Sequence, residues 1–97
     1  MYADSRNSLK NILQWLEGTD DAGWENQIEL GEECRSDMER MARPIYRRNR
    51  TFQPPERNPD AAKLDRASPH VRAMLHAMRS RNRTAALEHG RAALAVM

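Results

Sequence analysis

The spacing of the apolar residues constrains the fold most, because it repeats every three or four positions along much of the chain. One set falls at i, i+3, i+4 and i+7: Leu9, Ile12, Leu13 and Leu16. The same spacing recurs at Val71, Met74, Leu75 and Met78. Such spacing places apolar side chains on one face of a helix. Strands are not predicted, because alternating β-branched runs are absent and only two valines occur. The sequence therefore predicts an all-α protein.

Helix-terminating residues set the bounds of the N-terminal helices. The first helix is predicted over Ser5 to Glu17, because Gly18 is typical of a helix C-terminus. Asp20 or Asp21 is expected to cap a second, longer helix. That helix should end or kink at Pro44, because proline disfavours helical geometry in the residue before it.

The C-terminal third is predicted to be a helical hairpin. A short fifth helix is expected at Asp60 to Ala67. Ser68 followed by Pro69 then resembles an N-cap with proline in the first turn, which predicts that a new helix begins there. Asn82 or Thr84 can start the last helix. The predicted fold is thus a small bundle of four main helices, with the short fifth and a Pro-rich connection.

The 97 residues are expected to form a single domain. Within it, the sign of the net charge differs between the N-terminal and C-terminal parts. We distinguish an acidic N-terminal helical part at 1–46, a Pro/Arg-rich linker at 47–59 and a basic helical hairpin at 60–97. Residues 1–39 carry a net charge of −7 and residues 40–97 a net charge of +9. Opposite signs can attract each other within one chain or between two chains, or the basic half can attract a polyanion.

Residues suited to catalysis or metal binding are sparse and lack a recognisable pattern. His70, His76 and His89 have no metal-ligand spacing, and there is no glycine-rich phosphate loop. Cys34 lies among acidic residues, which disfavour a reactive thiolate, so a structural thiol is expected. We therefore expect no enzyme, no cofactor and no metal site.

Cysteine usage and hydropathy bear on the compartment. A single cysteine cannot form an internal disulfide, and the chain opens without the apolar run of a signal peptide. No apolar run approaches membrane-spanning length. A cytoplasmic protein without membrane contact is expected.

Arginines gather in two clusters that allow two interpretations. The first cluster is interleaved with aromatic residues and comprises Arg43, Tyr46, Arg47, Arg48, Arg50 and Phe52. The second comprises Arg72, Arg79, Arg81 and Arg83. Arginine near the last carbonyls of a helix stabilises the helix end without a ligand. Alternatively, the clusters contact nucleic-acid phosphates and bases, or a partner protein.

The two tryptophans and six methionines are candidates for both core packing and partner binding. Trp15 and Trp24 either close the edge of the core or serve as interface anchors. Methionine suits both cores and adaptable binding surfaces. The leading hypothesis is a non-catalytic helical protein that regulates or inhibits a partner protein by stoichiometric contact. Because a chain this short has a thin core, a partner subunit is also expected, and the hypothesis includes a homodimer. Its size and arginine content suit an inhibitor that a phage or mobile element directs at a host machine. The alternative is nucleic-acid binding through the arginine clusters.

Overall fold

A computed structural model describes residues 2–43 and 59–97, which form four helices and, within those ranges, no strand. The helices are α1 (Tyr2–Glu17), α2 (Trp24–Ala42), α3 (Ala61–Arg79) and α4 (Arg83–Ala95). The predicted all-α bundle of four main helices is confirmed. The predicted linker at 47–59 lies outside the described residues except for Pro59.

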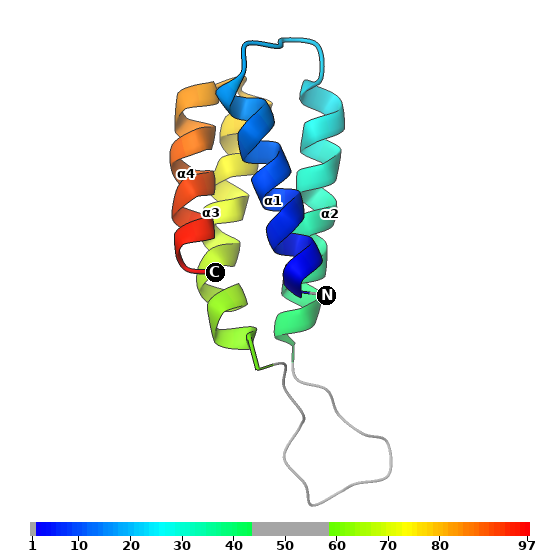
Figure 1. Ribbon diagram of the computed structural model, residues 1–97, viewed down its shortest axis with the longest axis vertical. Coiled ribbons are helices and arrows are strands. Elements are labelled where there is room, and N and C mark those ends of the chain that lie inside the picture. The colour runs from blue at the N-terminus through cyan, green and yellow to red at the C-terminus, as the bar shows by residue number, and fades with distance from the viewer. Residues whose placement is uncertain (1, 44–58) are drawn as a thin grey trace, which may run out of the picture.

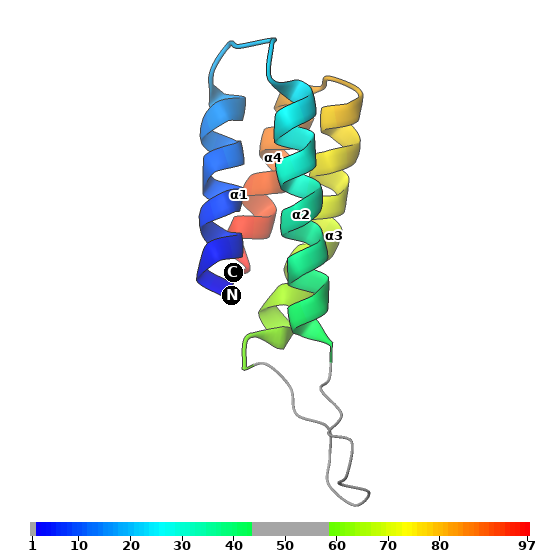
Figure 2. The same cartoon turned by 90° about the vertical axis from the view of Figure 1, so that its right-hand side faces the viewer.

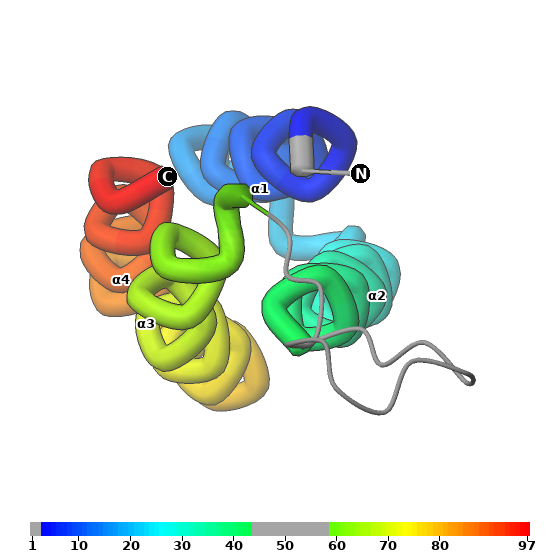
Figure 3. The backbone as a smooth tube through the Cα atoms, turned by 90° about the horizontal axis from the view of Figure 1, so that it is seen from below, coloured from blue at the N-terminus to red at the C-terminus, as the bar shows by residue number. Residues whose placement is uncertain are grey.

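The helices run alternately up and down and form a closed ring in cross-section (Figures 1, 2 and 3). Each helix packs against its neighbours in the chain, and α4 packs back against α1. In Figure 3, α1 and α3 therefore lie across the ring from each other, as do α2 and α4. The α3–α4 pair is the predicted C-terminal hairpin. The α2–α3 interface lies opposite the α1–α4 interface.

The predicted apolar stripes form the core. All eight side chains are at most 5% exposed: Leu9, Ile12, Leu13, Leu16, Val71, Met74, Leu75 and Met78. Met38 of α2 is also fully buried, so three of the methionines fill the core. Because polar residues occupy the outer faces, no helix in the described ranges is both long and apolar enough to cross a membrane.

Two glycines let the helices approach closely. A Cβ on Gly31 of α2 would lie 2.5 Å from the Leu75 Cδ2 of α3. A Cβ on Gly90 of α4 would lie 2.4 Å from Leu13 Cδ2 and 2.9 Å from Met74 Sδ. The absent side chains therefore make room for core residues of the neighbouring helices.

The prediction of a separate short helix at Asp60 to Ala67 is wrong. Residues 61–79 form one helix with Pro69 inside it. Leu64 and Ala67 are fully buried and extend the apolar stripe of α3 through its first turns. Pro69 lies on the exposed side, where water can hydrate the preceding turn. Burial of a continuous stripe therefore outweighs the helix-breaking tendency of proline.

The predicted cap of α2 is also wrong, whereas two other helix ends are confirmed. Gly23 is the N-cap and makes no side-chain bond, because Asp20 Oδ1 instead accepts a bond from the Ala22 N–H at 2.8 Å within the loop. At the other end, α2 stops before Arg43, whose backbone is extended. Asn82 caps α4 by accepting a bond from the Ala85 N–H at 3.1 Å.

Candidate functional site

Two indole rings meet where the α1–α2 loop approaches the α3–α4 turn. The centroids of Trp15 and Trp24 lie 4.8 Å apart with the rings nearly perpendicular. Trp24 is 8% exposed and Trp15 is half-buried, so both close this end of the core. The Arg83 guanidinium carbon lies 4.8 Å from the Trp15 centroid and 4.9 Å from that of Trp24. This arrangement adds a cation–π contribution to the packing.

Arg83 also binds the end of α1. Its Nη1 donates to the carbonyls of Trp15 and Leu16, each at 3.0 Å, and its Nη2 donates to the carbonyl of Asp20 at 2.6 Å. The last carbonyls of a helix have no partner within the helix, so these bonds add partners to the end of α1, where the Trp15 carbonyl also accepts from the Gly18 N–H at 3.1 Å. Arg83 therefore stabilises a helix end without a ligand, but the end is that of α1, because Arg83 itself is the first residue of α4.

Arg81 has an unusual backbone conformation for its residue type. Its φ is 57°, in the left-handed region, and its N–H donates to the Met78 carbonyl at 3.0 Å. The Asn82 N–H donates to the Ala77 carbonyl at 2.9 Å, which completes a Schellman helix end. Glycine usually occupies this position. The Arg81 side chain extends over Trp24, with the guanidinium carbon 5.4 Å from the centroid.

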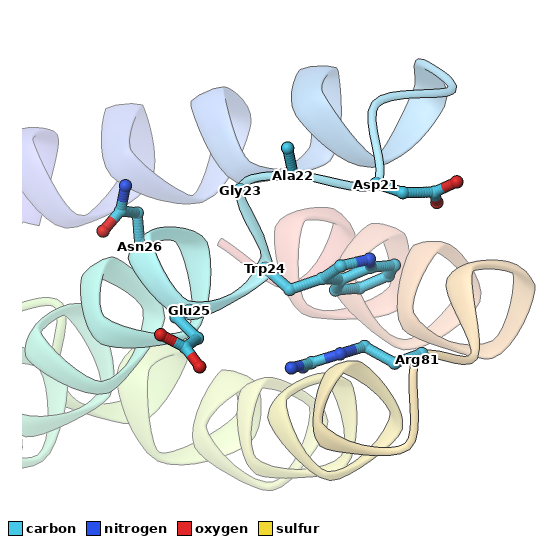
Figure 4. Close-up of a pocket in the computed structure, with 7 residues that line it drawn as sticks. All are labelled: Asp21, Ala22, Gly23, Trp24, Glu25, Asn26 and Arg81. Atoms are coloured by element: carbon cyan, nitrogen blue, oxygen red, sulfur yellow. The ribbon is translucent and has the colours of Figure 1, made fainter.

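An open hollow of about 330 Å³ lies beside this side chain, and we call it the upper hollow. Its lining comprises Asp21, Ala22, Gly23, Trp24, Glu25, Asn26 and Arg81. Figure 4 shows Arg81 running along Trp24, with its guanidinium group toward Glu25 on the first turn of α2. The upper hollow thus offers an aromatic edge, a cation and carboxylates to one ligand.

A network of ion pairs joins α2 to α3 below the upper hollow. Arg35 pairs with Glu32 and Glu39, each at 2.9 Å, along α2. Between the helices, Arg79 pairs with Glu32, and Arg72 pairs with Glu39. A second hollow of about 360 Å³, which we call the middle hollow, lies at this network. Its lining comprises Glu32, Arg35, Arg72, Leu75 and Arg79. Part of the charge asymmetry in the sequence is therefore neutralised within one chain.

A third hollow of about 500 Å³, the lower hollow, continues along the same two helices. Its lining comprises Glu39, Ala42, Arg43, Asp65, Ser68, Pro69 and Arg72. Arg72 lines both the middle and the lower hollow. We call the exposed face along α2 and α3, together with the upper hollow at its loop end, the α2–α3 seam. It is the candidate functional site.

The predicted site residues divide into three groups. Arg72, Arg79 and Arg81 line the seam, and Arg43 lies exposed at its lower end. Arg83 supports the fold instead. The remaining members of the first cluster lie outside the described residues: Tyr46, Arg47, Arg48, Arg50 and Phe52.

The glutamates that pair with these arginines, Glu32 and Glu39, were not predicted as site residues from the sequence. Glu32, Arg35 and Glu39 have the i, i+3 and i, i+4 spacings of helix ion pairs, and that spacing was the available signal. It does not reveal that Arg72 and Arg79 complete the network, because those residues come from another helix.

Cys34 lies away from the seam, in the contact between α1 and α2. Its Sγ lies 3.4 Å from the Ser5 carbonyl oxygen and 3.7 Å from Met38 Sδ, and its single S–H can donate to either. Burial, and secondarily the charge of Asp37, raises the pKa of the thiol to about 11. These contacts suit a structural thiol. Within residues 2–43 and 59–97, no three His, Cys, Asp or Glu side chains form a group that could hold a metal ion.

No protein-family model matches the chain, and no curated protein or solved structure is significantly similar to it. Likeness to other proteins therefore assigns no role to the residues of the α2–α3 seam. Their roles must follow from their burial, charge and contacts.

Proposed function

We propose that this protein acts without catalysis, by binding another protein stoichiometrically along the α2–α3 seam as a regulator or inhibitor. The observation that carries the proposal is the alignment of three hollows on one face. A row of hollows suits several side chains of one partner segment. From Trp24 to Arg43 the seam extends for about 28 Å at a rise of 1.5 Å per residue, enough for a partner helix of about five turns.

The residue types on the seam favour a protein partner. Tryptophan and arginine are the residue types that contribute most often to interface hot spots, and Trp24 and Arg81 adjoin in the upper hollow. Arg81 keeps a left-handed backbone at a position where glycine is less strained. Strained residues of this kind concentrate at functional sites, so the side chain is expected to have a use beyond ending α3.

The wider setting belongs to the same proposal. We envisage a cytoplasmic protein that self-associates as a homodimer, and whose small size suits a phage or mobile-element inhibitor of a host machine. Glu25, Glu29 and Glu33 repeat at intervals of four along α2 and are exposed. Like charges at this spacing destabilise a helix slightly, so a basic surface on a second molecule would relieve them.

Nucleic-acid binding is the alternative function. The distribution of charge favours residues 44–58 as the segment that would bind. Residues 2–43 and 59–97 hold thirteen acidic and twelve basic side chains, a net charge of −1. Residues 44–58 hold four arginines and one glutamate. Arg72, Arg79 and Arg83 already bind carboxylates or carbonyls within the bundle. The alternative therefore rests mainly on the first arginine cluster.

Site-specific photocrosslinking in the source cells tests the protein-binding proposal. A benzoylphenylalanine replaces His76, which is exposed one turn from Arg72, and in a control it replaces Gln14, which is exposed on α1. We expect a single protein adduct from position 76 and none from position 14. The crosslinked protein, once purified, should form a complex of fixed stoichiometry by light scattering. Equal adducts from both positions, or no adduct from position 76, would contradict the proposal.

A further inference from the structure

The middle hollow carries an excess of positive charge. Three guanidinium groups (Arg35, Arg72 and Arg79) surround two carboxylates (Glu32 and Glu39), which leaves a net charge of +1. Leu75 adds an apolar surface to the hollow. We infer that this hollow receives one carboxylate side chain, an aspartate or glutamate, of the partner protein. The inference rests on the proposed function and names the chemistry of its central contact.

The arginines divide between a supporting role and a binding role. Arg35 donates through Nε, Nη1 and Nη2 to the two glutamates and is 28% exposed, so it fixes their positions. The contacts to glutamate use two nitrogens of Arg72 and one of Arg79. Their side chains are 62% and 56% exposed. Since a guanidinium has five N–H donors, both groups retain donors for an incoming carboxylate.

The flanking hollows select against a polyanion and favour a protein segment of mixed charge. The carboxylates of Asp21 and Glu25 outnumber the one arginine of the upper hollow, and in the lower hollow two carboxylates, Glu39 and Asp65, balance two arginines. A run of phosphates would meet these carboxylates on both sides of the arginines. A single carboxylate flanked by basic side chains would meet the excess positive charge of the middle hollow, and its basic neighbours would meet carboxylates in the other two hollows.

The spacing along α2 gives the pattern of the partner. Glu25, Glu32 and Glu39 lie seven residues apart, one in or beside each hollow. Successive glutamates are therefore two helical turns apart, which is about 10 Å along the helix axis. A partner helix aligned with the seam therefore carries an acidic residue with a basic residue about seven positions before it and another about seven positions after it.

Two synthetic helical peptides test the inference at low ionic strength. Both are alanine-rich and carry arginines fourteen positions apart, and they differ only in a central Glu or Gln. We expect the Glu peptide to bind at least tenfold more tightly and to shift the NMR signals of the Arg72 and Arg79 Nε–H groups. Equal binding of the two peptides, or no binding of either, would overturn the inference.

Matched variants locate the effect on the protein. Arg72→Gln/Arg79→Gln should abolish the preference for the Glu peptide. Arg91→Gln should keep it, because Arg91 is similarly exposed, at 61%, but pairs with Glu17 on the opposite side of the bundle. Exposed ion pairs add little to the stability of a fold, so both variants should fold, which circular dichroism checks. Loss of the preference in Arg91→Gln would contradict the assignment to the middle hollow.

The two proposals can fail separately. If position 76 crosslinks a partner whose affinity is unchanged by Arg72→Gln/Arg79→Gln, the carboxylate inference is wrong while protein binding stands. If the Glu peptide binds as expected but position 76 crosslinks no partner, the middle hollow does bind a carboxylate, but the proposed function is wrong and the carboxylate does not come from a protein bound along the seam.

Discussion

Cys34 shows how burial alone can remove the reactivity of a residue that looks chemically useful in a sequence. Its side chain is 4% exposed, and its Sγ lies against a backbone carbonyl of α1. Desolvation disfavours the thiolate, and the nearby charge of Asp37 adds to the effect. Because the thiolate is the nucleophile, the native protein should react slowly with thiol reagents at pH 8.

The raised pKa also predicts a loss of stability in alkaline solution. The thiol pKa rises from 9.0 to about 11 on folding, so the native state retains a proton that the unfolded chain releases between these values. The contribution of this proton is fully present below pH 9 and is lost as the pH rises through 11. By pH 11 the loss should reach about 2 kcal/mol.

Urea unfolding of the wild type and Cys34→Ala from pH 8 to pH 11 measures this loss. The other titrating groups are common to both proteins, so the difference in their free energies of unfolding isolates Cys34. That difference should shift against the wild type by about 2 kcal/mol between the two ends of the range. A difference independent of pH would show that the folded thiol titrates normally.

At the scale of the helices, local chemistry predicted the four main elements and some of their ends. Apolar spacing identified the helices, Pro44 identified the end of α2, and Asn82 identified the start of α4. These signals act within a few residues, so they can be recognised in the sequence. Pro69 shows the limit, because its local preference for a first turn is overridden by burial of Leu64 and Ala67. That burial depends on neighbouring helices.

Gly90 and Gly31 allow a prediction about helix packing. Alanine favours a helix over glycine by up to about 1 kcal/mol, but overpacking costs about 1 to 3 kcal/mol. A Cβ at Gly90 would collide with Leu13 of α1 and Met74 of α3, whereas a Cβ at Gly31 meets one methyl group of Leu75 below 3.0 Å. Gly90→Ala should therefore lower the free energy of unfolding by about 1 to 2 kcal/mol, and Gly31→Ala by less.

Thermal and urea unfolding of the two variants provide the comparison, with each glycine serving as the control for the other. Both substitutions add the same methyl group to a helix interior, so helix propensity cancels between them. Equal stability of the two variants would mean that α1 and α3 move apart at Gly90 without cost.

At the scale of the whole molecule, the charge asymmetry was visible in the sequence, but its use was not. Glu32 pairs with Arg79, and Glu39 pairs with Arg72, across 47 and 33 residues of chain. Identifying these pairs requires knowing that α2 and α3 are neighbours and how they are aligned. The sequence equally allowed attraction between two chains. The seam emerges only from the packed helices, since α2 and α3 together line its middle and lower hollows, and the α1–α2 loop, the first turn of α2 and Arg81 of the α3–α4 turn line the upper one.

The distribution of the remaining charge leads to a prediction that separates the protein-binding proposal from its nucleic-acid alternative. Since residues 2–43 and 59–97 carry a net charge of −1, they provide little attraction for a polyanion. We expect light scattering after size exclusion to show no complex with a mixed-sequence duplex or a single strand. Without nucleic acid, the mass should correspond to a dimer at low salt and a monomer at high salt.

A retained nucleic-acid complex would instead favour the alternative, and two variants would then locate it. Arg47→Ala/Arg48→Ala/Arg50→Ala should weaken such a complex and flatten its salt dependence, because each lost phosphate contact reduces the number of released counterions. Arg72→Gln/Arg79→Gln should change it little, because both arginines already bind glutamates. Retention of the complex only in the second variant would assign nucleic-acid binding to the first arginine cluster and leave the α2–α3 seam without a part in it.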